Sequence, residues 1–200
     1  MMQEQLTVPG WVLDQLFLQA RTYPRFLEKE VSDEQIQTLH ELMRWGPTAF
    51  NSQPARFLFL KSASAKGRLA ACVSSSNKSK ILSAAVSVVV VQDLSFAKDL
   101  PRFTAHPHAQ MLFSQWPEII EPTALRNASL QGAYLIMAAR SLGLDVGVLT
   151  GFDSKAITKE FFGDHANWQP NFVVNIGIGD KQSLADRFPR YTFHEVATIL

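Results

Sequence analysis

A run of valines and alanines, Ala84-Ala85-Val86-Ser87-Val88-Val89-Val90-Val91, is the feature that most constrains the fold. β-Branched residues favour strands, because their side chains pack well on a pleated surface. A strand that is apolar on both faces normally lies inside a sheet that is covered on both sides. The run is too short to cross a bilayer, which takes about 20 apolar residues. It therefore predicts a buried central strand.

Helical and strand patterns alternate around this run. Ser32-Asp33-Glu34-Gln35 is typical of a capping box, and the helix that it begins should end at Gly46-Pro47, because proline cannot continue the hydrogen-bond ladder. The strongest helical pattern spans residues 124–142, and Gly143 stands where a C-terminal cap belongs. Further helices are expected at 11–20, at 66–73 and from Asp153 to Gly163, and further strands at 57–60 and 172–177.

Helices that separate short strands indicate a mixed α/β or α+β fold. No repeat or linker divides the 200 residues, so we expect one domain over residues 1–200. The polar stretch 74–80 follows the helix expected at 66–73, and residues 95–123 are irregular and rich in proline. A long excursion of this kind is typical of a binding loop or lid, with Phe103, Phe113 and Trp116 as its exposed aromatic residues.

Composition narrows the functional classes. Charged residues make up only 18% of the chain and hydrophobic residues 46%, which favours an oligomer with an apolar interface. The net charge of +1 gives no field that would recruit nucleic acid or an anionic membrane. The single cysteine, Cys72, excludes an internal disulfide and indicates a small buried hydrophobe in a reducing compartment. Because no signal-peptide pattern is present, a cytoplasmic protein is expected.

The segment Trp45-Gly46-Pro47-Thr48-Ala49-Phe50-Asn51-Ser52-Gln53-Pro54 has the chemistry of a ligand-holding loop. It is uncharged and rich in groups that both donate and accept hydrogen bonds, which suits a planar heterocycle edged with N–H and C=O groups. An ordinary turn whose amides bond to their own backbone has the same composition. The residues alone leave both interpretations open.

Arginines gather near both ends of the chain, in Arg21-Thr22-Tyr23-Pro24-Arg25 and in Arg187-Phe188-Pro189-Arg190. The planar guanidinium fork suits a phosphate, because it donates two hydrogen bonds to one anion. The two clusters can share a phosphate only if the fold brings them together. Otherwise each is a solvated surface feature.

Four landmarks, in order, resemble the FMN-dependent nitroreductase superfamily over almost the full chain. Arg21-Thr22 resembles its N-terminal phosphate motif, and the segment from Pro47 to Pro54 resembles its flavin loop. Asn77-Lys78-Ser79-Lys80 resembles the segment beside the pyrimidine edge of the flavin. Thr150-Gly151-Phe152-Asp153 resembles the flavin-facing loop, with Arg190 as the last phosphate arginine.

The resemblance implies a nitroreductase-like fold, with a central mixed β-sheet flanked by helices and an intertwined homodimer. FMN would lie at the dimer interface and take residues from both subunits, and the small-residue helix at 128–139 would pack in the dimer. NADH or NADPH would be the co-substrate, and Lys80 would stabilise negative charge on the reduced flavin. The implied cofactor-binding residues are Arg21, Thr22, Pro47, Thr48, Asn51, Gln53, Asn77, Lys80, Asn127, Leu149, Thr150, Gly151, Arg187 and Arg190.

Within the superfamily, features such as Arg126-Asn127 and Asn175-Ile176-Gly177 are similar to the malonic semialdehyde reductase subgroup, provisionally described as NAD(P)H nitroreductases. The implied reaction is a ping-pong transfer of hydride, through flavin N5, to a small aldehyde, nitro compound or quinone. One position departs from the family pattern. The second N-terminal arginine is replaced by Pro24, and Arg25 follows one residue later.

No protein nucleophile or zinc spacing can be picked out, so the expectation is no metal and no protein nucleophile, with the chemistry carried by FMN. His106 and His108, on the expected lid, are candidate proton donors or plain surface residues. Two other classes remain open. One is a flavin-binding sensor without turnover, and the other is a flavin-free dehydrogenase suggested by Gly177-Ile178-Gly179, which lacks the third glycine of a dinucleotide fingerprint.

Overall fold

The structure is a computed structural model that describes residues 8–163 and 165–200. Its centre is a four-stranded sheet in the order β1-β2-β4-β3, and every neighbouring pair is antiparallel. Parallel pairing occurs at the isolated bridge between Thr22 and Val146. The strands are β1 (Ala55–Leu60), β2 (Val86–Asp93), β3 (Asp145–Leu149) and β4 (Trp168–Gly177).

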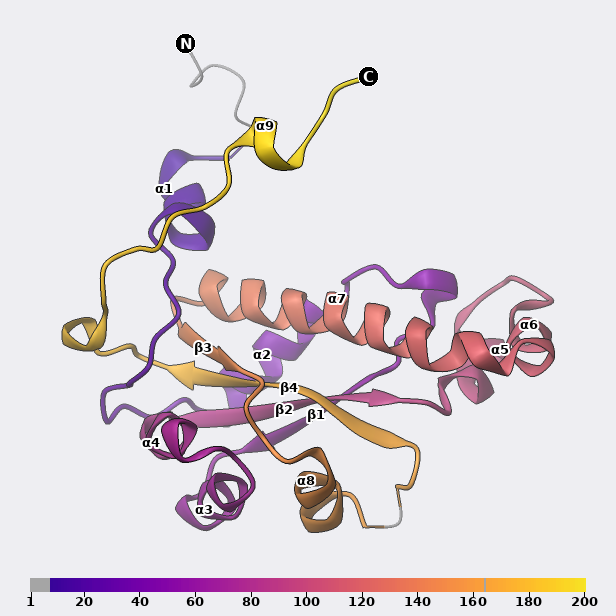
Figure 1. The fold of residues 1–200 in the computed structure, drawn as a ribbon, viewed down its shortest axis with the longest axis horizontal. Coiled ribbons are helices and arrows are strands. Elements are labelled where there is room, and N and C mark those ends of the chain that lie inside the picture. The colour runs from indigo at the N-terminus through magenta and orange to yellow at the C-terminus, as the bar shows by residue number, and fades with distance from the viewer. Residues whose placement is uncertain (1–7, 164) are drawn as a thin grey trace.

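The central-strand prediction is confirmed by β2, whose residues are all buried. It lies between β1 and β4 and is covered on both faces (Figure 1). Val88 and Val90 pack in the core beneath α2 and α7, whereas Val89 and Val91 pack beneath α3, α4 and α8. Alternate side chains of a strand point to opposite faces, so a valine run fills both layers.

Helices form the outer layers. α2 and α7 lie on one face of the sheet, and α3, α4 and α8 lie on the other (Figure 1). The expected capping box begins α2, since the Ser32 hydroxyl accepts from Gln35 N and the Gln35 side chain accepts from Ser32 N. The bounds are α1 (Gly10–Leu13), α2 (Asp33–Met43), α3 (Ala63–Ala71), α4 (Ser75–Ser83), α5 (Leu100–Phe103), α6 (Ala109–Gln115), α7 (Ile120–Ser141), α8 (Ser154–Phe161) and α9 (Phe193–Val196).

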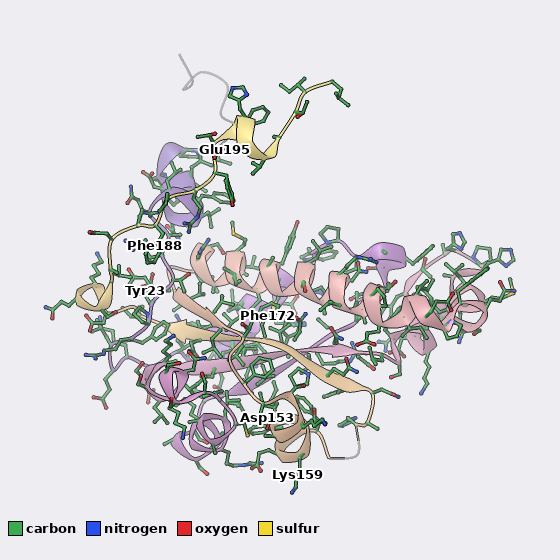
Figure 2. The ribbon with its side chains drawn as sticks, viewed as in Figure 1. Tyr23, Asp153, Lys159, Phe172, Phe188 and Glu195 are labelled. Atoms are coloured by element: carbon green, nitrogen blue, oxygen red, sulfur yellow. The ribbon has the colours of Figure 1, made fainter. Side chains whose placement is uncertain are left out.

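The small residues of α7 serve the chain's own core. Gly132 faces Phe172 of β4, and a Cβ at Gly132 would collide with that ring. Figure 2 shows Phe172 between the sheet and α7. Ala128, Ala138 and Ala139 are buried as well. These small residues are therefore covered within the chain, whereas Leu130 and Tyr134 on the same helix are exposed, so the packing of this helix in a dimer stays a prediction.

Two terminal arms project beyond this body. α1, continued by a π-helical turn at Asp14–Leu18, lies beside the C-terminal segment that carries α9 (Figure 1). Both arms expose large apolar side chains. Those that are more than half exposed are Trp11, Phe17, Leu18, Phe188, Tyr191, Phe193, Val196, Ile199 and Leu200.

Two elements were not predicted, and one expectation needs correction. The polar stretch 74–80 forms most of α4, and the segment 145–149 forms strand β3. Residues 95–123 contain α5, α6 and two 3-10 turns, with a small core of their own. Phe113 belongs to that core and is only 2% exposed, so it is not an exposed aromatic residue of a lid. No helix within the described ranges is long and apolar enough to cross a membrane.

Candidate functional site

A cleft of about 660 Å³ opens where the two terminal segments meet the end of the sheet. Its walls come from the segment after the π-helical turn, from α4, from β3 and β4, and from the C-terminal arm. Figure 2 shows Tyr23 and Phe188, both in its lining, on the side of the molecule where the two arms join the body. Six of the expected cofactor residues line this one cleft: Arg21, Thr22, Lys80, Leu149, Arg187 and Arg190.

The fold brings the two arginine clusters together. Arg21 Nη2 donates to the carbonyl of Ala185, and Arg187 Nη2 donates back to the carbonyls of Leu18 and Ala20. These bonds join residues that are 164 to 169 positions apart in the chain. Each guanidinium carries five N–H donors, so both retain donors for an anion in the cleft.

The cleft is strongly cationic. The lining contains one carboxylate, Asp186, against five cationic side chains: Arg21, Lys80, Arg140, Arg187 and Arg190. Like charges gathered in one cleft repel one another. An anionic ligand would relieve that repulsion.

Lys80 is held in place by a chain of hydrogen bonds. Its Nζ donates to Asn77 Oδ1 at 2.9 Å, and Asn77 Nδ2 donates to the Gly151 carbonyl at 3.1 Å. A Cβ on Gly151 would come within 2.7 Å of Asn77 Nδ2, so the glycine permits this close approach. Asn77, 7% exposed, therefore links Lys80 to the loop that contains Thr150.

Two residues of the cleft were missed by the sequence reasoning. Arg140, in the last turn of α7, donates from Nη1 to the Leu16 carbonyl at 2.9 Å, and burial lowers its pKa. Asn175, in the middle of β4, is fully buried and also lines the cleft. Asn175 is a single polar residue in the apolar run 172–176, and that contrast was the available signal, whereas Arg140 is followed by Ser141 at the end of its helix and had no such signal.

The remaining expected residues form a second cluster, around the loop 47–53. The Asn127 Oδ1 on α7 accepts from Ala49 N at 2.8 Å, and its Nδ2 donates to the carbonyl of Thr123. The Thr48 hydroxyl accepts from Gln53 N at 3.2 Å. Pro47 is exposed beside this turn.

This loop is strained. Phe50, Asn51 and Gln53 have φ values of 55°, 52° and 42°, a region that non-glycine residues rarely occupy. Asn51 Nδ2 donates to the Phe103 carbonyl, and Gln53 Nε2 donates to Asn51. Residues are held in such conformations mainly at functional sites, where the surrounding structure fixes them. The amides are partly used inside the chain, as the ordinary-turn interpretation requires, yet Asn51 remains exposed.

The two clusters do not meet within one chain. Asn127 contacts the loop near the start of α7, whereas Arg140 lines the cleft near its end. A helix rises 1.5 Å per residue, so these two positions are about 20 Å apart along α7. The residues expected to bind one cofactor therefore lie at opposite ends of the molecule.

The structure also locates the candidate proton donors, the cysteine and the Gly-x-Gly segment. His106 and His108 are exposed, and the His106 ring lies 5.3 Å from that of Phe50 in the strained loop. Cys72 is buried, and burial raises the pKa of its thiol, which leaves it a poor nucleophile.

Within residues 8–163 and 165–200, no cluster of three or more His, Cys, Asp or Glu side chains could hold a metal ion. Gly177-Ile178-Gly179 ends β4 and is followed by a 3-10 turn, not by the helix that a dinucleotide fingerprint requires.

Comparisons with known proteins agree on one family. The sequence model of the nitroreductase family matches residues 18–178. A relative from Rhodopseudomonas palustris, provisionally named NADH dehydrogenase/NAD(P)H nitroreductase, is 45% identical over 97% of this chain and 98% of its own length. A relative of the same provisional name from Ralstonia nicotianae is 44% identical, over 97% and 99%.

Solved structures share the fold. A nitroreductase-type protein from Bacillus subtilis superposes with a TM-score of 0.83 at 20% identity, over 94% of this chain and 98% of its own. A protein from Exiguobacterium sibiricum, whose structure holds FMN, superposes with a TM-score of 0.82 at 16% identity, over 98% of both chains. The nitroreductase-like fold expected from the sequence is thereby confirmed.

Proposed function

This chain belongs to the nitroreductase family, and from that membership we propose that it is an FMN-dependent oxidoreductase that uses NADH or NADPH. The observation that carries the proposal is the cleft in which Arg21, Lys80, Arg187 and Arg190 converge from three separate parts of the chain. These cations fit a phosphate-bearing cofactor, because guanidinium forks bind phosphate oxygens in pairs. The volume of the cleft, about 660 Å³, lies within the range of cofactor sites.

The residues of the cleft have distinct roles in this proposal. Arg21, Arg187 and Arg190 would hold the phosphate, with Thr22 beside them. When bound, FMN supplies the redox chemistry, taking a hydride from the nicotinamide and passing the electrons to an acceptor. Lys80, held by Asn77, places a positive charge in the wall of the cleft. That charge would favour the reduced form of the cofactor, because the reduced form carries more negative charge. Leu149, Thr150 and Gly151 offer backbone groups at the end of β3.

A homodimer resolves the separation of the two clusters. The loop with Pro47, Thr48, Asn51 and Gln53, braced by Asn127, would face the cleft of a second chain. The large apolar side chains exposed on both arms support this arrangement, because a second chain would cover apolar surface that otherwise faces water. Each of the two sites would then combine the cationic cleft of one subunit with the strained loop of the other.

Subunit mixing tests the composite site. One variant carries Arg187→Ala and Arg190→Ala, and the other carries Asn51→Ala and Gln53→Ala. Each alone should bind FMN poorly. A mixed dimer should regain one intact site, because the unaltered cleft of one chain meets the unaltered loop of the other. If both clusters served a site within one chain, mixing would restore nothing.

An absorption spectrum of the purified protein tests the function itself. We expect flavin bands that bleach when NADH or NADPH is added without oxygen. Bands that persist would identify a flavin-binding protein without this turnover. Absence of bands after reconstitution with FMN would refute the flavin assignment.

The acceptor is proposed as a small oxidised molecule, reduced in a ping-pong cycle in the space that the nicotinamide leaves. The candidates are an aldehyde acid such as malonic semialdehyde, a nitro compound or a quinone. Arg102 would serve a carboxylate-bearing acceptor, since its guanidinium stacks on Phe103 at 4.8 Å and lines a second cavity of about 300 Å³ beside Gln53. Steady-state rates with charged and uncharged acceptors, each with NADH and with NADPH, would rank these candidates.

The single cysteine is consistent with a cytoplasmic location.

A further inference from the structure

A buried polar pair interrupts the valine-rich sheet directly behind the cleft. Ser87 of β2 and Asn175 of β4 are cross-strand partners, and both are 0% exposed. Their neighbours along the two strands are Val86, Val88, Val174 and Ile176. A polar pair at this depth needs an explanation, because apolar side chains of similar shape would fill the same space without the desolvation of polar atoms.

Within the pair, the oxygen of the Asn175 side-chain amide has a hydrogen-bond partner and its nitrogen has none. The Ser87 hydroxyl donates to Asn175 Oδ1 at 2.7 Å, which fixes the orientation of the side chain. Asn175 Nδ2 has no hydrogen-bond partner among residues 8–163 and 165–200. Buried donors without partners are rare in folded proteins, and a native one commonly marks a place where a ligand or water supplies the acceptor.

The position of this donor points to the ligand. Asn175 lines the same cleft as Lys80 and Leu149. Its partner on the neighbouring strand β3 is Gly147, which has no side chain to accept a hydrogen bond. Gly147 cannot be replaced by a larger residue, because the carbonyl of Tyr23 occupies the space of a Cβ. The wall beside Asn175 is thus formed by the Gly147 backbone and the Tyr23 carbonyl, and no side chain from this position of β3 offers an acceptor.

We infer that Asn175 is a further residue of the cofactor site, oriented by Ser87 so that its Nδ2 donates to an oxygen or nitrogen acceptor of the bound FMN. The inference rests on the proposed function, since it concerns the same cleft. FMN carries acceptors along its ring edge, its ribityl chain and its phosphate, whereas the described residues offer Nδ2 none. Asn175 would therefore contribute to the affinity for FMN and not only to the packing of the sheet.

Gln92 provides a matched control. It is also a buried amide of the sheet, 5% exposed, with one atom, Oε1, that has no partner in the described part of the chain. Its Nε2 donates to Gln169 Oε1 at 2.8 Å. It lies at the opposite end of β2 from Ser87 and is not part of the lining of the cleft. A general effect of removing a buried amide should appear in both positions.

The experiment is a titration of the apoprotein with FMN, followed by flavin fluorescence, for the wild type, Asn175→Leu, Asn175→Asp and Gln92→Leu. Asn175→Asp keeps an acceptor for Ser87 and removes the donor. We expect the dissociation constant to rise about tenfold in both Asn175 variants, which corresponds to about 1.4 kcal/mol. Gln92→Leu should stay within about twofold of the wild type, because Gln92 does not line the cleft and substitutions at distant sites without shared partners seldom influence each other.

An unchanged dissociation constant in a folded Asn175 variant would overturn the inference while leaving the proposed function intact. Failure of the wild type to bind FMN would instead refute the proposed function. If the Asn175 variants do not fold, the ¹⁵N–¹H spectrum of the wild type decides the question. The Asn175 side-chain amide signal should move on addition of FMN, and a signal that stays in place would contradict the hydrogen bond.

Discussion

A single side-chain amide holds the one lysine in the wall of the cleft. Asn77 accepts from Lys80 Nζ and donates to the Gly151 carbonyl, so the position of the charge depends on α4 and on the loop after β3. The sequence resemblance assigned Asn77 to direct contact with the flavin. The structure gives it a positioning role as well, because both of its polar atoms have partners inside the chain.

Lys80→Met should lower the midpoint potential of the bound flavin by about 30 mV or more, equivalent to about 1.4 kcal/mol for two electrons. The reason is that the fixed positive charge favours the reduced, more negative state. Asn77→Leu should shift the potential in the same direction by less, since the ammonium remains but is no longer held. Lys78→Met, which alters an exposed lysine of the same helix, is the control and should leave the potential unchanged. Equal shifts in Lys78→Met and Lys80→Met would refute the assignment.

Cys72 should make the folding stability fall as the pH rises above about 8.5, the pKa of a free thiol. Burial, with Glu160 and Asp153 nearby, raises the pKa of the native thiol. The unfolded chain therefore loses this proton at a lower pH than the native protein does, so stability is lost as the pH rises. Urea unfolding between pH 8 and 9.5 should show a flatter slope for Cys72→Ala. This range avoids Tyr23, whose raised pKa acts only at higher pH. Identical slopes in both proteins would contradict the effect.

At the level of elements, two helical glycines should respond to alanine in opposite ways. Gly132→Ala in α7 forces a methyl group into the Phe172 ring, and overpacking of this kind costs about 1–3 kcal/mol. Gly67→Ala in α3 meets nothing within 4 Å, so it should stabilise the protein by roughly 0.5–1 kcal/mol through helix propensity. Midpoints of denaturant unfolding give both values. A stabilising Gly132→Ala would show that Phe172 can move aside.

The elements also show what the sequence can and cannot predict. The run 84–91, the capping box at Ser32 and the cap at Asp153 are local patterns, and the structure confirms each of them. Strand β3 was missed because Gly147 interrupts its short valine pattern. That glycine is required by the Tyr23 carbonyl packed against it, a contact between distant segments.

Prolines misled the interpretation of residues 95–123. Pro101 stands at the start of α5, and Pro117 stands at the start of the 3-10 helix 117–119. The N–H groups at the start of a helix have no partner within it, so the missing N–H of a proline removes no hydrogen bond there. They begin these helices and do not break them. For the site, the motifs located the residues, but local patterns could not show that Arg21 and Arg187 meet or that the loop 47–53 lies far from both.

On the scale of the whole molecule, the cleft depends on two arms that have little core of their own. The C-terminal arm is exposed along residues 185–196 and is tied to the body by arginine–carbonyl bonds. Segments with few buried contacts open locally, and a ligand that binds only the closed form suppresses the opening.

Limited trypsin digestion should therefore cut the apoprotein quickly after Arg187 and Arg190, and slowly once FMN is present. Lys159 on α8, remote from the cleft in Figure 2, is an internal control. Its cleavage rate should not depend on FMN if protection is confined to the arm. Mass spectrometry of the fragments separates the two sites. Cleavage at Arg187 that ignores a saturating concentration of FMN would argue against arginines of this arm as cofactor ligands.

The hydrogen bonds of Arg21 to Ala185 and of Arg187 to Leu18 also determine when the cleft can form during protein synthesis. One wall of the cleft leaves the ribosome early, while its partner is still to be translated. Domains fold as their residues emerge from the ribosome. The cleft, however, cannot bind a cofactor until the segment around residue 190 has left the exit tunnel. A nascent chain would thus form its sheet and helices first, and the cleft would be completed only after the C-terminal arm has emerged.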